Sequence, residues 1–115
     1  MKNLLFITIL ISFMSDASEE LINAEWCIEQ EGITEYRTIY GTYIDCLTED
    51  FAIEVEYDYN WKESIGQALH YAEATNRNPG ILFIKRSKSK KNYLNELHNT
   101  IDKFNLPITV FVISN

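Results

Sequence analysis

The sequence has little glycine, proline or cysteine: four, two and two residues of each among 115. Disordered and low-complexity segments have a strongly biased composition, and repeat proteins show a fixed period; the sequence has neither feature. Hydrophobic residues make up 46% of the chain and aromatic residues 13%. This composition indicates one ordinary globular domain with a small core.

Cysteine and histidine patterns typical of zinc sites are also absent. No CxxC or HxxxH spacing occurs, so a zinc site is not expected. Cys27 and Cys46 allow a single disulfide, closing a loop of about 20 residues that would add on the order of 3 kcal/mol to the stability of the domain. The alternative is a pair of buried free thiols.

Basic residues are outnumbered by acidic ones, 10 against 17, which gives a net charge of −7. This argues against a protein that coats nucleic acid nonspecifically, because phosphate neutralisation supplies most of the affinity of such proteins. The charges are also segregated, with acidic residues gathered in Glu49–Glu63 and basic residues, without any acid, in Lys85–Lys91. The pattern fits a metal-dependent enzyme acting on a polyanion, and equally a soluble acidic domain.

The one long apolar run, Leu4–Phe13, is too short to span a bilayer, which takes roughly 20 residues. Lys2 precedes the run, and small residues at Ser15 and Ala17 follow it, so we predict a signal peptide over residues 1–17. The alternative is an N-terminal strand or buried helix. We therefore expect a mature domain over residues 18–115, exported to the periplasm or secreted, with no membrane association and with its cysteines in an oxidising compartment.

Periodicity predicts an α/β fold. Helices are expected at Glu19–Glu31, with Ser18 as N-cap, at Trp61–Thr75, and at Asn92–Phe104 with Phe104 inward; strands are expected at Ile33–Tyr40, Thr42–Leu47, Phe51–Tyr57, Ile81–Ile84 and Ile108–Ile113. The result is an α-β-β-β-α-β core, a mixed sheet flanked by helices, followed by a C-terminal helix and strand.

Carboxylates interrupt two of the predicted strands. Asp45 lies on one, and Glu54 and Glu56 share a face of the next. An unpaired carboxylate is costly away from water, so these positions suggest either a bound cation or a solvated strand face. Mg²⁺ prefers such oxygen ligands, and Asp45 and Glu54 on neighbouring strands could share one ion.

The helix at 61–75 carries Gln67 and Tyr71 four residues apart, on one face together with Glu63. This face lies roughly opposite the apolar face of the same helix. It is therefore either part of a site or a solvated helix surface.

Three motifs follow one another along the predicted elements: Asp45, then Glu54-Val55-Glu56, then Gln67-Ala68-Leu69-His70-Tyr71. In the order α-β-β-β-α-β they resemble the PD-(D/E)XK nuclease superfamily, the restriction-endonuclease-like fold, with a QxxxY element similar to that of its RecB-like branch. Over Glu25–Ile84 the chain is also similar to a group of small exported bacterial proteins of that superfamily.

The resemblance implies a metal-dependent nuclease that hydrolyses phosphodiester bonds in DNA or RNA, with Mg²⁺ or Mn²⁺ and no organic cofactor. Asp45 and Glu54 would hold the metal, and Glu25 or Glu35 would complete its shell. Gln67 and Tyr71 would steady the site or contact the substrate backbone.

The sequence departs from that pattern at one position, because Glu56 replaces the expected lysine. The lysine would orient the attacking water and stabilise charge on the phosphate, so Glu56, or Lys62 from the next helix, would have to take over. Lys85–Lys91 would contact phosphates, unless it is a solvated loop. The alternative functions are a catalytically inactive exported domain of the same fold that binds a protein or nucleic acid, and a structural role in the cell envelope.

Overall fold

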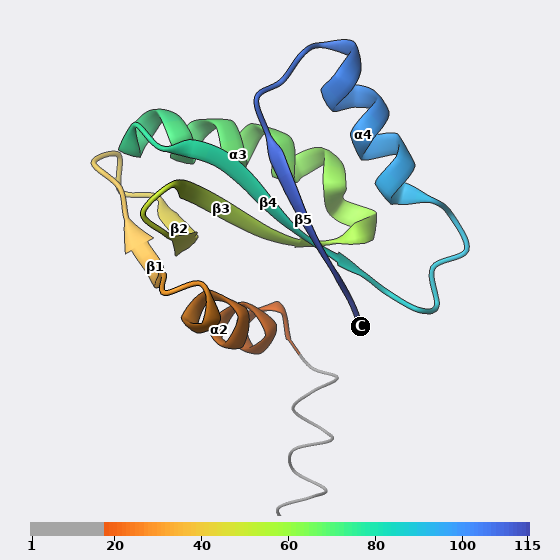
Figure 1. Cartoon of the computed structure of the whole chain (residues 1–115), viewed down its shortest axis with the longest axis horizontal. Coiled ribbons are helices and arrows are strands. Elements are labelled where there is room, and N and C mark those ends of the chain that lie inside the picture. Colours follow the sequence, from red (N-terminus) through yellow and green to blue (C-terminus); the bar gives the residue numbers. More distant parts are fainter. Residues whose placement is uncertain (1–17) are drawn as a thin grey trace, which may run out of the picture.

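The computed structural model describes residues 18–115, so the predicted signal peptide at 1–17 lies outside the described residues. The described elements are α2 (Glu19–Glu29), β1 (Ile33–Arg37), β2 (Tyr43–Leu47), β3 (Phe51–Tyr57), the 3-10 turn η1 (Asp58–Asn60), α3 (Trp61–Thr75), β4 (Asn78–Lys85), α4 (Tyr93–Lys103) and β5 (Thr109–Ser114) (Figure 1). The predicted α/β fold, with an α-β-β-β-α-β core and a C-terminal helix and strand, is confirmed.

The strands form one mixed sheet in the order β1-β2-β3-β4-β5. The first three are antiparallel neighbours, whereas β3, β4 and β5 run parallel to one another. The helices α3 and α4 make the two crossovers between the parallel strands. Both crossovers advance in the same direction across the sheet, which puts both helices on one face when the connections have the usual hand.

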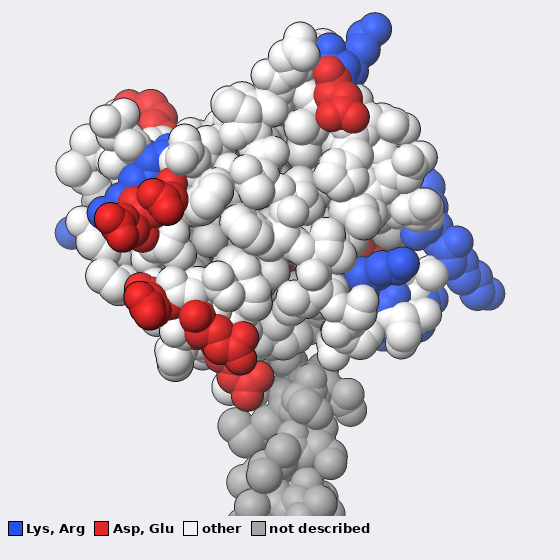
Figure 2. Space-filling model, in the orientation of Figure 1, with Lys and Arg blue, Asp and Glu red and all other residues white. Residues whose placement is uncertain are grey.

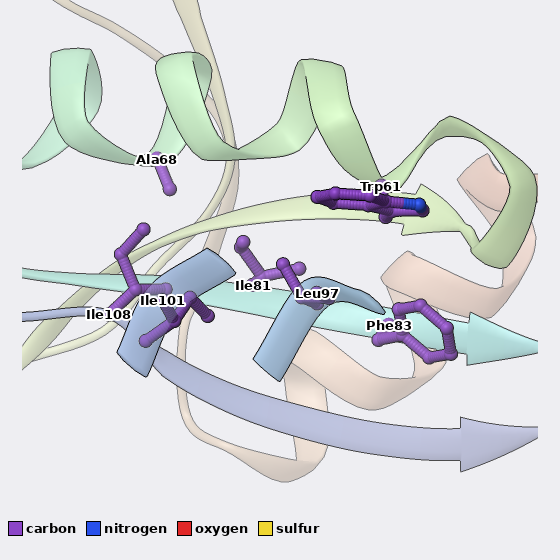
Figure 3. Close-up of a cluster of buried hydrophobic side chains, with 7 residues drawn as sticks. All are labelled: Trp61, Ala68, Ile81, Phe83, Leu97, Ile101 and Ile108. Atoms are coloured by element: carbon purple, nitrogen blue, oxygen red, sulfur yellow. The ribbon is translucent and has the colours of Figure 1, made fainter. Parts of the chain in front are cut away.

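The core has two layers, one on each face of the sheet. On one face, α3 and α4 pack over alternate residues of β4, and Figure 3 shows the cluster of Trp61, Ala68, Ile81, Phe83, Leu97, Ile101 and Ile108. On the other face, α2 packs over the intervening residues Leu82 and Ile84. Because β4 is buried on both faces, it has the continuous apolar sequence expected of a central parallel strand.

The helix α2 is capped at its start and linked covalently to the sheet near its end. Ser18 accepts a hydrogen bond from the backbone N–H of Leu21, as predicted for an N-cap. Cys27 and Cys46 form the disulfide that the sequence allows, with Cα atoms 5.7 Å apart. A Cβ atom at Gly32 would lie 2.7 Å from both sulfur atoms, so this position after the helix has room only for glycine.

Several predicted boundaries differ from the observed ones. The strand predicted at Ile81–Ile84 covers Asn78–Lys85, because its pairing with β3 already begins at Asn78. The ends of β2, β5 and α4 are shifted by one residue. The strand predicted to reach Tyr40 ends at Arg37, because Thr38 and Thr42 close a turn in which Gly41 has a φ of 83°. Helix α2 ends at Glu29, two residues early. Phe104 follows the end of α4 and is 68% exposed, so its predicted inward position is wrong.

Candidate functional site

The two antiparallel ladders both break beside Asp45. Strands β2 and β3 pair at Cys46 with Ile53 and at Leu47 with Ala52, and then separate. On the other side, the β1–β2 pairing skips the position of Glu35, whose φ of 53° is left-handed. The Asp45 side chain occupies the gap toward β3 and accepts a hydrogen bond of 2.8 Å from the backbone N–H of Val55. A carboxylate therefore substitutes for a missing strand partner.

Glu54 lies beside Asp45, and residues of α3 cover it. The Gln67 amide, oriented by its hydrogen-bond partners, places its nitrogen 2.5 and 3.0 Å from the two carboxylate oxygens of Glu54. Tyr71 hydrogen-bonds Glu54 and packs with Ile44 and Ala52, so it is buried. The structure thus brings together four of the predicted site residues, Asp45, Glu54, Gln67 and Tyr71.

The pair of carboxyl groups holds a proton at neutral pH. Burial, then the charge of Asp45 and a hydrogen bond to it, raise the pKa of Glu54 to about 10. Burial raises the pKa of Asp45 as well, although hydrogen bonds from Val55 and Glu54 oppose the rise. Burial, followed by the charges of Glu54 and Asp45, raises the pKa of Tyr71. Protonated Glu54 donates to Asp45, because two adjacent buried carboxylates cannot both be charged without a cation.

Glu56 and Lys62 lie at the edge of this arrangement. Burial raises the pKa of Glu56, and the Asn60 amide donates a long hydrogen bond of 3.4 Å to its carboxylate. Lys62 is exposed on the first turn of α3, with its ammonium 5.8 Å from the ring of Trp61. Among the described residues, Lys62 forms no salt bridge with any of the site carboxylates.

Helix α2 adds residues that the sequence did not indicate. A depression of about 290 Å³ beside Asp45 is lined by Glu19, Glu20, Asn23, Glu35, Asp45 and Val55. The Asn23 amide donates to the backbone oxygen of Asp45 over 2.8 Å, while its own side-chain oxygen is buried and has no hydrogen-bond partner among residues 18–115. Burial and the charges of Glu56 and Asp45 raise the pKa of Glu19 to about 7.

Of the two glutamates predicted to complete the metal shell, Glu35 is the one that lines this depression. Burial, and then the charge of Asp45, raise its pKa. Glu25 points instead to solvent on α2 and lies outside the depression. Helix α2 does contribute glutamates near Asp45, but from its first turn, at Glu19 and Glu20.

In the part of the chain that the structure describes, no group of three or more His, Cys, Asp or Glu side chains is arranged to hold a metal ion. The donors that converge on one point are the two carboxyl groups of Asp45 and Glu54. Mg²⁺ usually keeps several waters and takes only one or two protein carboxylates, so this pair fits a hydrated Mg²⁺ ion in exchange for the proton.

A second, basic pocket of about 210 Å³ lies where β4 ends and α4 begins. It is lined by Asp58, Phe83, Lys85, Ser89, Lys90, Lys91, Asn92, Tyr93 and Leu94. Arg86 neutralises the buried carboxylate of Asp58 at 2.8 Å. Figure 2 shows Lys and Arg side chains gathered on the right, over this connection, and Asp and Glu side chains at the lower left, over α2.

The curated relatives of this chain come from Acanthamoeba polyphaga mimivirus. "Putative KilA-N domain-containing protein R878" is 28% identical over 93 residues, which are 81% of this chain and 25% of the relative. "Putative KilA-N domain-containing protein L32" is 36% identical over 64 residues, 56% of this chain and 17% of the relative. The chain thus spans a quarter or less of the length of these relatives. No protein-family model matches the chain, and no solved structure gives a significant match.

These matches correct the family resemblance. The relatives are named for a KilA-N domain, so the predicted membership of the PD-(D/E)XK superfamily, the similarity to exported bacterial proteins of that superfamily and the metal-dependent nuclease function are wrong. The structure gives a physical reason: the short acidic motif is present on its strands, but Glu56 replaces the lysine, and among the described residues Lys62 forms no salt bridge with Asp45 or Glu54. The matches concern no single side chain, so the site residues stay a prediction.

The described part of the chain, residues 18–115, has no helix with the length and apolar character needed to cross a membrane.

Proposed function

We propose that this domain binds nucleic acid, with a backbone phosphate in the basic pocket at the start of α4. The observation that carries the proposal is the pocket itself, because lysines and a helix N-terminus converge on one small space. The first N–H groups of a helix and the positive end of its dipole favour an anion there. Phosphate contacts of this kind supply affinity without reading sequence.

Two of the basic residues are held in place by internal partners, and two others are available to a ligand. Arg86 pairs with Asp58 and stacks on Tyr59, with its guanidinium carbon 4.2 Å from the ring centre. Lys91 pairs with Glu96, with its ammonium nitrogen 3.6 Å from a carboxylate oxygen. Lys85 and Lys90 line the pocket, and no salt bridge within residues 18–115 includes either of them. The connection is therefore a fixed frame that presents two lysines.

Binding is tested with a fluorescently labelled DNA or RNA duplex by anisotropy at low salt. The double variant Lys85→Gln/Lys90→Gln is expected to bind about tenfold more weakly, since each lost phosphate contact removes a released counterion. Lys62→Gln/Lys103→Gln, at two exposed positions outside the pocket, is the charge-matched control and should bind like the wild type. Equal affinity of the double variant and the control would exclude the basic pocket as the phosphate site.

The acidic pair supports a second part of the proposal, a divalent cation such as Mg²⁺ or Mn²⁺ at Asp45 and Glu54. The ion would displace the proton that the pair otherwise holds, with Gln67 and Tyr71 keeping Glu54 in position. The orphaned oxygen of Asn23 beside Asp45 is available to a water of the ion. A bound cation would also offset part of the repulsion between this acidic protein and a phosphate.

Cation binding has its own test, which needs no nucleic acid. Titration calorimetry with Mg²⁺ and Mn²⁺ should give one site and the release of a proton, since Glu54 must deprotonate. Asp45→Asn and Glu54→Gln should each abolish the binding heat, whereas the exposed Glu25→Gln should retain it. Binding without proton release, or binding that persists in both variants, would argue against this pair.

We also propose that the protein matures in an oxidising compartment, as expected for an exported chain. The disulfide between Cys27 and Cys46 supports this, because structural disulfides form and persist where thiols are oxidised. Mass spectrometry of the native protein, alkylated before reduction, would reveal two free thiols if the proposal is wrong. The same spectra would show whether residues 1–17 have been removed.

A further inference from the structure

A pocket of about 320 Å³ lies at the end of the sheet where β3 begins. The basic pocket lies where the parallel strand β4 ends, so the two are at opposite ends of the sheet. The residues that line the pocket come from the end of α2, the β2–β3 turn and β5: Trp26, Gln30, Glu31, Thr48, Glu49, Asp50, Phe51, Ile53 and Phe111. We call it the aromatic pocket.

Three partly buried aromatic rings form its wall. The ring centres of Trp26 and Phe111 are 5.4 Å apart, and those of Phe51 and Phe111 are 5.3 Å apart in an edge-to-face contact. Gly80 allows this arrangement, since a Cβ atom there would lie 3.3 Å from Phe111 and 3.0 Å from Ile53. The rings therefore stand in a fixed geometry around a space that remains open.

Negative charge surrounds the same space. Glu31, Glu49 and Asp50 line it, and no salt bridge within residues 18–115 includes any of them. The C-terminal end of α2, with its negative dipole, points at the pocket and has no basic residue in its last turn. Arg77 donates from its guanidinium to the backbone oxygen of Thr48 in the turn.

Acidic residues at a helix C-terminus are unfavourable without a compensating cation, and Glu29 and Glu31 both occur at this one. Hard metal ions take oxygen ligands in a polar shell and gain nothing from aromatic walls. An organic cation gains from both features, because its charge is attracted to ring faces and carboxylates while its carbon chain packs on the rings.

We propose that the aromatic pocket binds an organic cation, the ammonium or guanidinium group of a basic side chain or of a small amine. Its volume is at the lower end of the range for small-molecule pockets, which suits one alkyl chain with a charged end. The carboxylates of Glu31 and Glu49 pair with the charge, and Trp26, Phe51 and Phe111 cover the chain. This site is independent of the phosphate pocket and of the acidic pair.

Trp26 supplies a direct readout. The other tryptophan, Trp61, is buried on the opposite face of the sheet, so a Trp61→Phe background leaves Trp26 as the single tryptophan. Butylammonium and ethylguanidinium are titrated while Trp26 fluorescence is followed, with neutral butyramide as a probe of similar size. We expect a saturable change with the cations and none with butyramide. An equal response to butyramide would overturn the proposal.

The charge requirement is tested with two variants of equal charge change in the same background. Glu31→Gln/Glu49→Gln should weaken cation binding at least tenfold, whereas Glu25→Gln/Asp102→Asn, at exposed positions outside the pocket, should leave it unchanged. Circular dichroism checks that each variant folds, and Phe111→Leu, which removes a ring without changing charge, serves as a second test. Unchanged binding in the folded pocket variants would overturn the proposal.

The source of the cation is separated by comparing blocked amino acids with free amines. Tighter binding of N-acetyl-lysine or N-acetyl-arginine methylamide than of butylammonium would support a basic protein segment as the partner. Tighter binding of a free diamine would support a small amine. A lack of binding by all of these cations would contradict the proposal.

Discussion

At the scale of single residues, the acidic pair of Asp45 and Glu54 is the electrostatically least favourable feature of the molecule. Glu54 is 5% exposed and has a carboxylate neighbour, and its own strand and α3 give it only the donors Gln67 and Tyr71. The folded state accommodates such a carboxyl group when the group keeps a proton or when a cation binds beside it. The pair is therefore a local cost that a bound ion would relieve, which is common at functional sites.

Glu54→Gln tests this cost through the pH dependence of stability. The pKa of Glu54 is about 10 when folded and 4.5 in its ordinary state, so the folded protein binds the extra proton between these values. Stability in the wild type should therefore fall as the pH rises from about 5 to 9, by at most about 1.4 kcal/mol per pH unit. The variant keeps the hydrogen bonds but cannot ionise, so its dependence should be flatter.

The measurement is urea unfolding across this pH range in the presence of EDTA. Glu25→Gln, an exposed change of the same chemistry on α2, should follow the wild-type curve. Excess Mg²⁺ should restore stability to the wild type at high pH and have little effect on Glu54→Gln. Parallel curves for wild type and Glu54→Gln would show that Glu54 is charged in the folded protein.

Substitution of alanine for glycine should have opposite effects on stability at Gly80 and Gly66. A Cβ atom at Gly80 would lie 3.0 Å from Ile53 within the packed sheet, so Gly80→Ala should cost about 1 to 3 kcal/mol. Gly66 lies in α3 with no atom within 4 Å of an added Cβ, so Gly66→Ala should stabilise by about 0.5 to 1 kcal/mol. Thermal unfolding of both variants measures the difference. A loss of stability in Gly66→Ala would contradict the helix packing described here.

At the scale of elements, the periodicity of apolar residues predicted the strands and helices that depend on local sequence. The strand Phe51–Tyr57 and the helix Trp61–Thr75 have the bounds expected from alternation and from a 3.6-residue period. The burial of Tyr71 was not decided by that period, because it depends on the packing of Tyr71 against Ile44 of β2 and Ala52 of β3. Glu19 and Asn23 were missed for the same reason: only the docking of α2 brings them to Asp45.

The site was predicted in part because its residues lie on strands that are neighbours in sequence. Asp45 and Glu54 lie on consecutive strands joined by one hairpin turn, so their proximity can be predicted from the sequence. The family assignment failed because a few acids at strand positions recur in unrelated sites, and the replacement of the lysine by Glu56 carried more information than the matching residues. A sequence motif indicates where residues of a given type occur, whereas the activity of a site depends on all of the groups that surround those residues.

The disulfide between α2 and β2 should contribute to the stability of the folded domain. Cys27→Ala/Cys46→Ala removes a bond that closes a loop of 19 residues, so the free energy of unfolding should fall by about 3 kcal/mol. Both sulfur atoms are fully buried, so reductant should act only once the protein unfolds. Urea unfolding with and without dithiothreitol measures the effect. A wild-type midpoint that does not respond to dithiothreitol would show that the bond adds nothing.

At the scale of the whole molecule, charge separation matters more than the net charge of −7. Acidic groups gather over α2 and around the acidic pair, while the β4–α4 connection is basic (Figure 2). A polyanion approaching the basic side is attracted locally and repelled at longer range by the acidic side. Salt weakens the long-range repulsion more than the local attraction, because the Debye length is about 10 Å at 0.1 M ionic strength.

The separation predicts an unusual effect of distant acids on association with nucleic acid. Glu25→Gln/Glu29→Gln neutralises two exposed groups on α2, outside the basic pocket and outside the acidic depression. At low salt the association rate with a DNA duplex should rise about two- to threefold, because long-range repulsion falls. At 0.3 M salt, roughly, the gain should vanish, since charges beyond a Debye length are screened. Stopped-flow anisotropy measures both rates, and the dissociation rate should not change because no contact is altered. An acceleration that persists at high salt would mean that α2 itself contacts the nucleic acid, which would move the interface away from the start of α4.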